Sequence, residues 1–318
     1  MEKDRAKGQR EPGIPIIYLA SHSRSGSTLV GSILGLADGY VYAGEIREVW
    51  RDGLTENQTC GCGVRFRDCP FWSAVFLRAF GGFDTEEVRQ TAAFVNRKDS
   101  LAGKLGLLWL AWRFPRGRPD GFEDLIGPLG KLYASIRDVS GASIIVDTSK
   151  TMRYAALLNA TPGLDVRMTN LIRDPRGIIY SRTQRARHRD GSAKPHASGY
   201  ERTRVLRIIG KWAVRNAMCA RVLRRDGGFR VLYEDFVADQ SWYLKGVLGD
   251  GEARDIARRL AEGIGADVVQ HQIAGNWVRG LKISPTQAWQ TKLPWLPSTV
   301  ARVLSAPLRW IYRSRSYE

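Results

Sequence analysis

Short apolar runs alternate with longer stretches of helical spacing along most of this chain. The first run, residues 14–20 (IPIIYLA), ends in a turn rich in serine and glycine, and apolar residues then recur every three or four positions from Leu29 to Leu36. A short apolar run followed by that period predicts a strand, a loop and a helix. The chain therefore begins with a βα unit.

Three further apolar runs predict strands. They span residues 143–147, 165–172 and 229–233, and helical segments lie between them, including a long one near residues 199–226. Strands that alternate with helices form parallel sheets that helices cover on both sides. We therefore predict an α/β fold with a parallel sheet flanked by helices.

Residues 50–140 interrupt this alternation. They contain three of the four cysteines and several Trp, Phe and Arg residues but no clear strand, which predicts a mostly helical insertion. Insertions of this kind commonly carry function, and we expect this one to form the acceptor side of a site. No internal repeat or low-complexity linker is visible, so residues 1–318 are expected to form one domain.

The end of the chain, residues 296–318, predicts a basic amphipathic segment. Apolar side chains between 296 and 312 share one helical face, and arginines lie beside them. Pro307 would kink this helix unless a new first turn begins there. Packing against the core is the favoured interpretation of the face, and peripheral membrane contact is the alternative.

Composition adds one strong constraint. Lysine and arginine outnumber aspartate and glutamate by 49 to 32, a formal net charge of +17. This charge implies an anionic partner, and nucleic acid, anionic lipid and phosphorylated small molecules all satisfy it. Arginines also crowd the stretch after the predicted strand 165–172, at Arg173, Arg176, Arg182, Arg185, Arg187 and Arg189. A solvated basic helix face would have the same composition, so the motifs must decide.

Several classes of protein and partner are not expected. The opening residues have no apolar core of a secretory signal, and the longest apolar run, Leu105–Trp112, is too short to span a bilayer. Neither an aromatic-rich strand motif nor a DNA-binding helix pair is present, so no nucleic-acid partner is expected. We expect a cytoplasmic protein, peripheral at a membrane only if the C-terminal segment binds one. The sequence predicts no particular oligomeric state.

A loop rich in small residues, Ser21–Thr28 (SHSRSGST), joins the first strand to the first helix. Free backbone N–H groups and the helix dipole create an anion site there, and small residues let the backbone wrap a phosphate closely. A helix cap alone would not need so many serine, threonine and glycine residues. The residues predicted to bind the anion are Ser23, Arg24, Ser25, Gly26, Ser27 and Thr28.

The loop is P-loop-like but lacks the nucleoside-triphosphatase motif Gly-x4-Gly-Lys-Ser/Thr. Ser21 replaces the first glycine, and Ser27 occupies the lysine position. The group that reaches the β and γ phosphates is therefore missing, and Arg24 is the cation instead. A nucleotide-dependent small-molecule kinase remains an alternative, which binding of ATP with Mg²⁺ would favour.

This loop resembles the 5′-phosphosulfate loop of the sulfotransferase superfamily that uses 3′-phosphoadenosine 5′-phosphosulfate (PAPS). The segment 171–182 (LIRDPRGIIYSR) resembles the family's 3′-phosphate element, in which an arginine at a strand end and a serine on the next helix bind that phosphate. Arg173 and Ser181 occupy these positions, and Pro175 suits the first turn of the helix between them. The resemblance implies a P-loop-like sulfotransferase domain whose product is 3′-phosphoadenosine 5′-phosphate (PAP).

Further segments resemble bacterial and tyrosylprotein members of the family. Gly44-Glu45-Ile46-Arg47 matches a turn whose glutamate is the acceptor base, Asp147–Lys150 matches a strand end, and Tyr233-Glu234-Asp235 matches a turn. His271-x3-Gly275-Asn276-x2-Arg279 with Trp289 matches their C-terminal segment, although Thr286 and Gln287 stand where an acidic residue is expected. The resemblance thus adds Tyr233, Asn276 and Arg279 to the cofactor-binding residues.

Sulfuryl transfer mainly requires alignment of the reacting groups and neutralisation of charge on the leaving phosphate. Arg24 and the loop amides suit the second task. Lys150 is predicted either to hold the sulfonate or to pair with Asp147. Fixed cations can replace Mg²⁺ here, so no metal is expected to be required. Glu45 is the predicted base for the acceptor hydroxyl, with His22 and His188 as alternatives.

Cys60, Cys62 and Cys69 lie in a segment, CGCGVRFRDCPFW, that is similar to Cys-rich segments of bacterial members. Cys-x-Cys is not the usual Cys-x2-Cys zinc spacing, and only three ligands are local. Free thiols are the favoured interpretation, with structural zinc and a disulfide as alternatives.

The sequence thus favours a PAPS-dependent sulfotransferase that acts on a hydroxyl of a carbohydrate, glycolipid or secondary metabolite. Two alternatives stay open. One is the kinase, and the other is a non-catalytic protein that binds an anionic nucleic acid or membrane.

Overall fold

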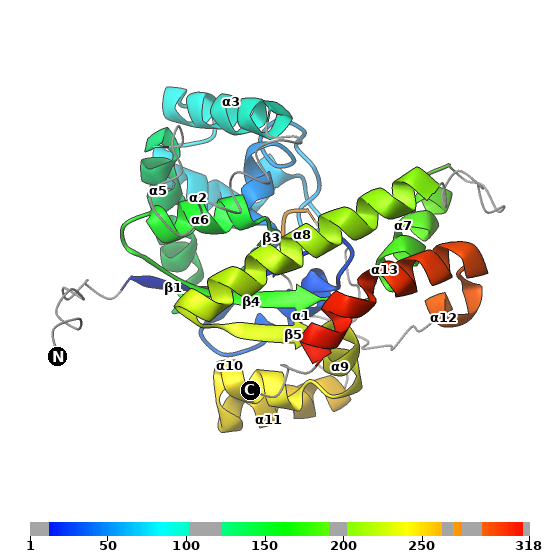
Figure 1. Cartoon of the computed structure of the whole chain (residues 1–318). Helices are drawn as coiled ribbons and strands as arrows, with labels where there is room; N and C mark the ends of the chain where they lie inside the picture. The colour runs from blue at the N-terminus through cyan, green and yellow to red at the C-terminus, as the bar shows by residue number, and fades with distance from the viewer. Residues whose placement is uncertain (1–12, 102–122, 191–201, 263–269, 275–287, 314–318) are drawn as a thin grey trace, which may run out of the picture. The chain divides into compact units, whose positions relative to one another are not determined.

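The structure is a computed structural model. It describes residues 13–101, 123–190, 202–262, 270–274 and 288–313 (Figure 1). The strands are β1 (Ile14–Ser21), β2 (Tyr40–Tyr42), β3 (Ile144–Lys150), β4 (Leu164–Ile172) and β5 (Phe229–Leu232). They form one parallel sheet in the order β2-β3-β1-β4-β5, flanked by helices. This confirms the predicted α/β class.

Four of the five strands coincide with the predicted apolar runs. β2 was not predicted, because it has only three residues and Tyr42 alone among them is buried. Its place in the sheet comes from pairing with β3, in which Tyr40 lies opposite Ile144 and Tyr42 opposite Val146. That partner lies far along the chain, so no local pattern marks β2 as a strand.

The chain divides into two compact units, each assembled from separate segments. The first unit contains Met1–Tyr18, Leu34–Arg167 and Val268–Trp277, and the second contains Leu19–Ile33, Met168–Asp267 and Val278–Glu318. β1 and β4 contribute residues to both. This division does not test whether the chain is a single domain, which stays a prediction from the sequence.

The helices of the first unit belong mainly to the predicted insertion. They are α2 (Pro70–Phe80), α3 (Glu86–Leu101), α5 (Glu123–Ser140) and α6 (Met152–Ala160), with short 3₁₀ turns η1 (Ile46–Trp50) and η2 (Phe66–Asp68). The described part of the insertion is therefore helical, as predicted. Its role on an acceptor side stays a prediction, and residues 102–122 lie outside the described residues.

Aromatic side chains fill the core beneath α2. Proline at the first position starts this helix, and Gly81, at φ 78°, ends it. Trp72 and Phe76 are fully buried in it, and the ring of Phe66 packs against both, with centroids 5.2 and 5.8 Å away. α2 packs on α5. Burial of these large rings stabilises the unit around residues 60–80.

The second unit contains the remaining helices. They are α1 (Ser27–Leu34), α7 (Pro175–Asp190), α8 (Arg202–Asp226), α9 (Tyr233–Ala238), α10 (Ser241–Leu248), α11 (Asp250–Ala261), α12 (Ala288–Lys292) and α13 (Trp295–Arg313). α1 ends one residue inside the first unit. Figure 1 shows α13, in red, beside α7 and α8, and α13 packs against both of them.

The amphipathic C-terminal helix is present as predicted, and α13 continues through Pro307. Ala301, Ser305 and Tyr312 are buried, and Tyr312 meets Trp212 of α8 edge to face. The core-packing interpretation therefore accounts for one face. Other apolar side chains of the helix are exposed, with Trp295 at 76%. No helix in the described part of the chain is long and apolar enough to cross a membrane.

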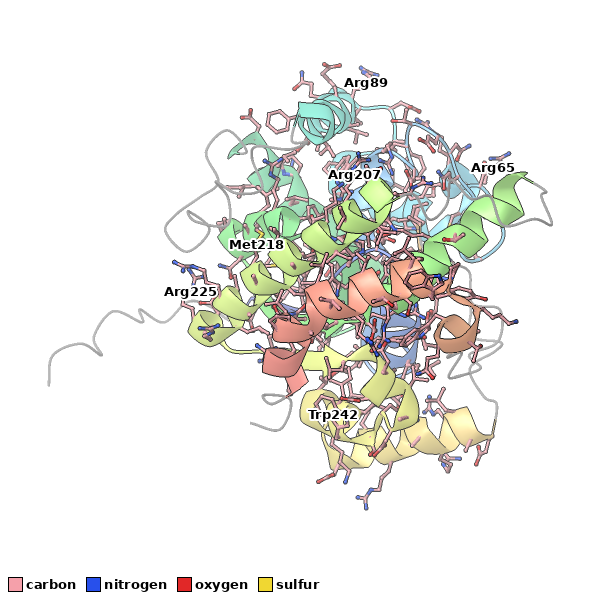
Figure 2. All side chains as sticks on the ribbon, turned by 45° about the vertical axis from the view of Figure 1, so that its right-hand side comes forward. Arg65, Arg89, Arg207, Met218, Arg225 and Trp242 are labelled. Atoms are coloured by element: carbon pink, nitrogen blue, oxygen red, sulfur yellow. The ribbon has the colours of Figure 1, made fainter. Side chains whose placement is uncertain are left out.

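Basic side chains are spread over the surface of the described residues. Figure 2 labels four arginines that are exposed, two of them on α8. They are Arg65, Arg89, Arg207 and Arg225. Surface charge of this kind is solvated, so the basic residues with fixed, buried contacts carry more information about a site.

Candidate functional site

The loop between β1 and α1 is a compact turn with an unusual backbone. The Ser25 N–H donates to the carbonyl of His22 (3.1 Å), and both Arg24 and Gly26 have positive φ, 74° and 89°. Arg24 is not glycine, so this conformation costs ~1–3 kcal/mol. Strain of this kind collects where a backbone must fit a ligand.

Arg24 joins the two segments that the sequence analysis matched separately. Its Nε donates to Ser181 Oγ (2.9 Å), and Arg173 Nη1 donates to the carbonyl of Arg24 (2.9 Å). Trp212 Nε1 donates to the carbonyl of Arg173 (2.9 Å), which fixes the end of β4. The predicted 5′-phosphate loop and the predicted 3′-phosphate pair therefore form one connected group within the second unit.

Tyr233 packs between this loop and Arg173. A Cβ at Gly26 would lie 2.1 Å from Tyr233 Cε2, so the ring lies directly on the glycine. The guanidinium carbon of Arg173 lies 4.5 Å from the centre of the same ring, a cation–π distance. Glu234 accepts from the Asp174 N–H (3.1 Å), which ties this turn to the end of β4. Tyr233, predicted to bind cofactor, here orients the arginine.

Ser21 Oγ, at the start of the loop, is buried without a hydrogen-bond partner among the described residues. So are two atoms of the residues predicted to bind the nucleotide, Ser25 Oγ and Arg173 Nε. A buried polar group left unpaired costs ~1–3 kcal/mol, so such atoms mark a place where a ligand is expected. The Ser25 hydroxyl and the Arg173 Nε–H can each donate a hydrogen bond to an anion.

Positive charge is concentrated around the loop. Arg182 Nη2 donates to Ser23 Oγ (3.3 Å), and Arg215 Nη1 donates to the carbonyl of Ser21 (2.7 Å). Burial lowers the pKa of Arg182, and the charges of Arg204 and Arg215 lower it further. These guanidinium groups repel one another, and a bound anion would relieve that repulsion.

His22 is a poor candidate for a base. Its Nδ1 donates to the carbonyl of Ser23 (2.8 Å), and burial lowers the pKa of its imidazole to about 4. Arg215, Arg182 and Lys211 lower it further. The ring is therefore neutral at pH 7 and supports the loop. The side chain of His188, the other alternative, lies outside the described residues.

The second group of predicted catalytic residues lies in the first unit, at the end of β3. Lys150 has φ 68° and its Nζ donates to Glu45 Oε1. Both side chains are largely buried, at 12% and 16% exposure. The Glu45 N–H donates to the carbonyl of Ile273 (3.0 Å). Lys150 thus pairs with the predicted base, and the alternative pairing with Asp147 is not what the structure has.

Asp147 instead organises the end of β3. It accepts hydrogen bonds from Tyr133 Oη (2.5 Å), Ser149 Oγ (2.5 Å) and the Ser149 N–H (2.8 Å). Burial raises the pKa of its carboxyl to about 6, although these hydrogen bonds act in the opposite direction and lower it. Ser149 Oγ also accepts from the Arg47 N–H (3.0 Å). Sequence reasoning missed Tyr133, whose contact with Asp147 leaves no local motif, and it named Arg47 only as part of the matched turn.

The solved structures that are similar to this chain include two sulfotransferases. The sulfotransferase domain of the Synechococcus PCC 7002 olefin synthase is 15% identical, with a TM-score of 0.40 over 95% of this chain and 97% of that one. The sulfotransferase STF9 from Mycobacterium avium is 12% identical, with a TM-score of 0.45 over 93% of this chain and 76% of that one. Both are sulfotransferases. No family model and no curated protein sequence matches the chain.

Both TM-scores are below 0.5, so function is argued below from the residues of this chain alone. Asn276 and Arg279 lie outside the described residues. Trp289 is described, and the guanidinium carbon of Arg176 lies 4.5 Å from the centre of its ring. Arg176 also forms an ion pair with Asp174 (2.7 Å). The Arg176 guanidinium therefore already has an anionic partner, whereas the Nε of Arg173 has no hydrogen-bond partner in the described part of the chain.

A pocket in the second unit was not predicted. It has a volume of about 560 Å³ and is lined by basic and hydroxyl side chains. These include Arg176, Lys292, Arg302, Thr291, Ser298 and Thr299. Sequence reasoning missed the pocket, because its lining comes from the start of α7, from α12 and α13, and from the turn between those two helices.

Proposed function

We propose that this protein is a sulfotransferase that transfers the sulfuryl group of PAPS to a hydroxyl of a carbohydrate, glycolipid or secondary metabolite. The observation that carries the proposal is the connected group of Arg24, Ser181 and Arg173, with two buried donors unpaired. A single phosphate needs only the loop at a helix N-terminus. The additional arginine and serine suit a second phosphate on the same nucleotide.

The residues present fit a nucleotide with two anionic ends. The 5′ anion would be bound by the backbone and hydroxyls of Ser23–Thr28 together with Arg24. The 3′-phosphate would be bound by Arg173 and Ser181, and the unpaired Nε of Arg173 gives it a donor that needs no rearrangement of other contacts. Tyr233 fixes the plane of that guanidinium.

PAPS supplies the activated sulfuryl group when it is bound. Arg24 and the loop amides stabilise the negative charge that develops on the leaving phosphate. Glu45 accepts the proton of the acceptor hydroxyl, and Lys150 holds the Glu45 carboxylate in position. The proposal keeps the cytoplasm as the location and includes no nucleic-acid partner, as the sequence suggested.

Nucleotide binding tests the proposal before any acceptor is known. PAP should raise the melting temperature without added metal, and AMP should not reproduce the shift, because it lacks the 3′-phosphate. Arg173→Ala removes charge-assisted hydrogen bonds worth ~1.5–3 kcal/mol, so PAP affinity should fall about 10- to 100-fold.

The matched control is Arg225→Ala, which removes the same charge from an exposed position at the end of α8 (Figure 2). It should leave PAP affinity unchanged. Equal or stronger stabilisation by ATP with Mg²⁺ would favour the kinase instead. An equal loss of PAP affinity in the two variants would mean that PAP binds by nonspecific charge attraction and not at this site.

A further inference from the structure

Three cysteines and one histidine meet in the first unit, and none of them is assigned above to the reaction. Cys60, Cys62 and Cys69 are not in disulfides, and the side chain of His271 completes the group. The four candidate ligand atoms, three Sγ and one imidazole nitrogen, all lie within 4.8 Å of one another. From the sequence alone free thiols are the favoured interpretation, because only three candidate ligands lie near one another along the chain.

The shorter distances within this Cys₃His cluster are close to those of a tetrahedral metal site. Cys62 Sγ lies 3.6 Å from Cys69 Sγ, and His271 Nδ1 lies 3.2 Å from Cys69 Sγ and 3.9 Å from Cys60 Sγ. Zinc bonds of ~2.3 Å to sulfur and ~2.0–2.1 Å to nitrogen, at tetrahedral angles, separate sulfur atoms by about 3.8 Å and sulfur from nitrogen by about 3.6 Å. Small side-chain rotations are enough to accept an ion.

The backbone explains how the unusual Cys-x-Cys spacing brings two thiols together. The Cys60 N–H donates to the Val64 carbonyl (2.8 Å), and the Gly63 N–H donates to the Cys60 carbonyl (2.9 Å). Gly63 has φ 98°, which favours glycine. A Cβ at Gly61 would lie 2.1 Å from the Gln270 carbonyl oxygen, so the turn closes directly on the segment that carries the histidine.

His271 is fixed in place by contacts that do not involve the thiols. Its ring stacks on Phe71, with centroids 4.9 Å apart and an angle of 12°. Its carbonyl accepts from Trp72 Nε1 (2.9 Å), and the neighbouring Gln272 carbonyl accepts from the Gly61 N–H (3.0 Å). These contacts therefore hold the fourth ligand in position before a metal binds, as supporting contacts around metal ligands commonly do.

We propose that Cys60, Cys62, Cys69 and His271 bind one structural zinc ion. Thiolate and imidazole ligands in a tetrahedral set select zinc over magnesium or calcium, which prefer oxygen. Four protein ligands leave no open position, so the ion stabilises the fold and does not react. A disulfide between Cys62 and Cys69 would use only two of the four side chains and would not explain why Cys60 and His271 lie beside them.

The ion would connect the Cys-rich turn to residues 270–274. The carbonyl of Ile273 in that segment accepts from the Glu45 N–H (3.0 Å), and the Ile273 N–H donates to the Ala43 carbonyl (3.2 Å). Zinc therefore anchors the strand-like segment on which the turn at Gly44 and Glu45 rests. The inference itself needs only the Cys₃His cluster and is independent of the sulfotransferase proposal.

Metal analysis of the purified full-length chain tests the proposal. We expect one zinc per chain, retained through gel filtration, and a strong loss of zinc in Cys62→Ser and in His271→Ala. Cys219→Ser is the matched control, because Cys219 is a buried cysteine that forms no disulfide and lies outside the cluster, and this variant should keep the full zinc content.

Cobalt replacement keeps the test decisive if the ligand variants fail to fold. The wild-type chain refolded with Co²⁺ alone should show the visible bands of tetrahedral cobalt and a thiolate-to-cobalt charge-transfer band. Wild-type protein that holds no zinc after expression with zinc, and that gives an octahedral cobalt spectrum, would overturn the proposal. So would a Cys62–Cys69 disulfide in the intact protein, measured by mass spectrometry.

Discussion

Replacing Gly26 with alanine tests the anion loop by adding one methyl group. Gly26 has φ 89°, and a Cβ there would lie 2.1 Å from Cε2 and 2.4 Å from Cδ2 of Tyr233. The same ring lies under the guanidinium of Arg173, whose carbon is 4.5 Å from the ring centre. The methyl group therefore strains the backbone and also displaces the side chain that orients Arg173.

The expected loss of stability has two parts. A residue with a side chain in the left-handed region costs ~1–2 kcal/mol. Carbon atoms pack at ~3.5–4.0 Å, so the ring must move by about 1.5 Å, and overpacking of this kind costs ~1–3 kcal/mol. Gly26→Ala should therefore lower the free energy of unfolding by about 2–5 kcal/mol.

The same change should weaken nucleotide binding. A displaced Tyr233 ring removes the cation–π contact of Arg173, which is worth ~0.5–2 kcal/mol. PAP affinity should then fall about 2- to 30-fold. Urea denaturation measures the first effect and titration calorimetry with PAP measures the second.

Two controls separate local strain from general damage. Gly210→Ala lies in α8, where an added Cβ meets no atom within 4 Å, so it should raise stability by ~0.5–1 kcal/mol and leave PAP affinity unchanged. In a Tyr233→Ala background the clash is absent, and Gly26→Ala should cost only its backbone part, ~1–2 kcal/mol. Equal costs with and without the ring would refute the close contact. Parent-like stability and affinity would refute the loop as a nucleotide site.

Two further predictions concern the candidate bases. Glu45→Gln should cut turnover by about 100-fold, the scale of general-base catalysis, without changing PAP affinity by calorimetry; near-normal turnover would eliminate Glu45 as the base. His22 has a folded-state pKa of about 4 against an ordinary 6.5, because burial favours its neutral form. Its contribution to stability is complete above pH 6.5 and falls by about 3 kcal/mol as the pH drops to 4. His22→Asn should remove that part of the decline in urea denaturation, and an unchanged pH dependence would contradict the buried neutral ring.

The strands that could be predicted are those whose own residues are apolar. β1, β3, β4 and β5 each have buried runs, and the periodicity of the chain reveals them. β2 has no such signal, because its stability comes from pairing with β3. Burial and alternation are local properties, whereas pairing depends on residues brought together only by the fold.

The candidate site divides in the same way. The loop could be predicted from its residue types and Arg173 from the family resemblance, but the contact of Arg24 with Ser181 spans 157 residues. The ion pair of Lys150 with Glu45 spans 105 residues, and the contact of Cys69 with His271 spans 202. His271 was visible in the sequence as part of a motif. Only the fold brings it to the cysteines.

Arg24 and Lys150 share a backbone feature that links stability to function. Each follows a run of buried β residues, each carries a cation, and each has positive φ without being glycine, at 74° and 68°. Glycine would adopt these angles without the ~1–3 kcal/mol of strain but would supply no cation. The strain is sustained by surrounding contacts, Ser181 at Arg24 and Glu45 at Lys150. Arg24 is thus a cation fixed before an anionic ligand arrives, and Lys150 is a cation fixed against the Glu45 carboxylate. A preorganised charge of either kind costs no rearrangement during the reaction.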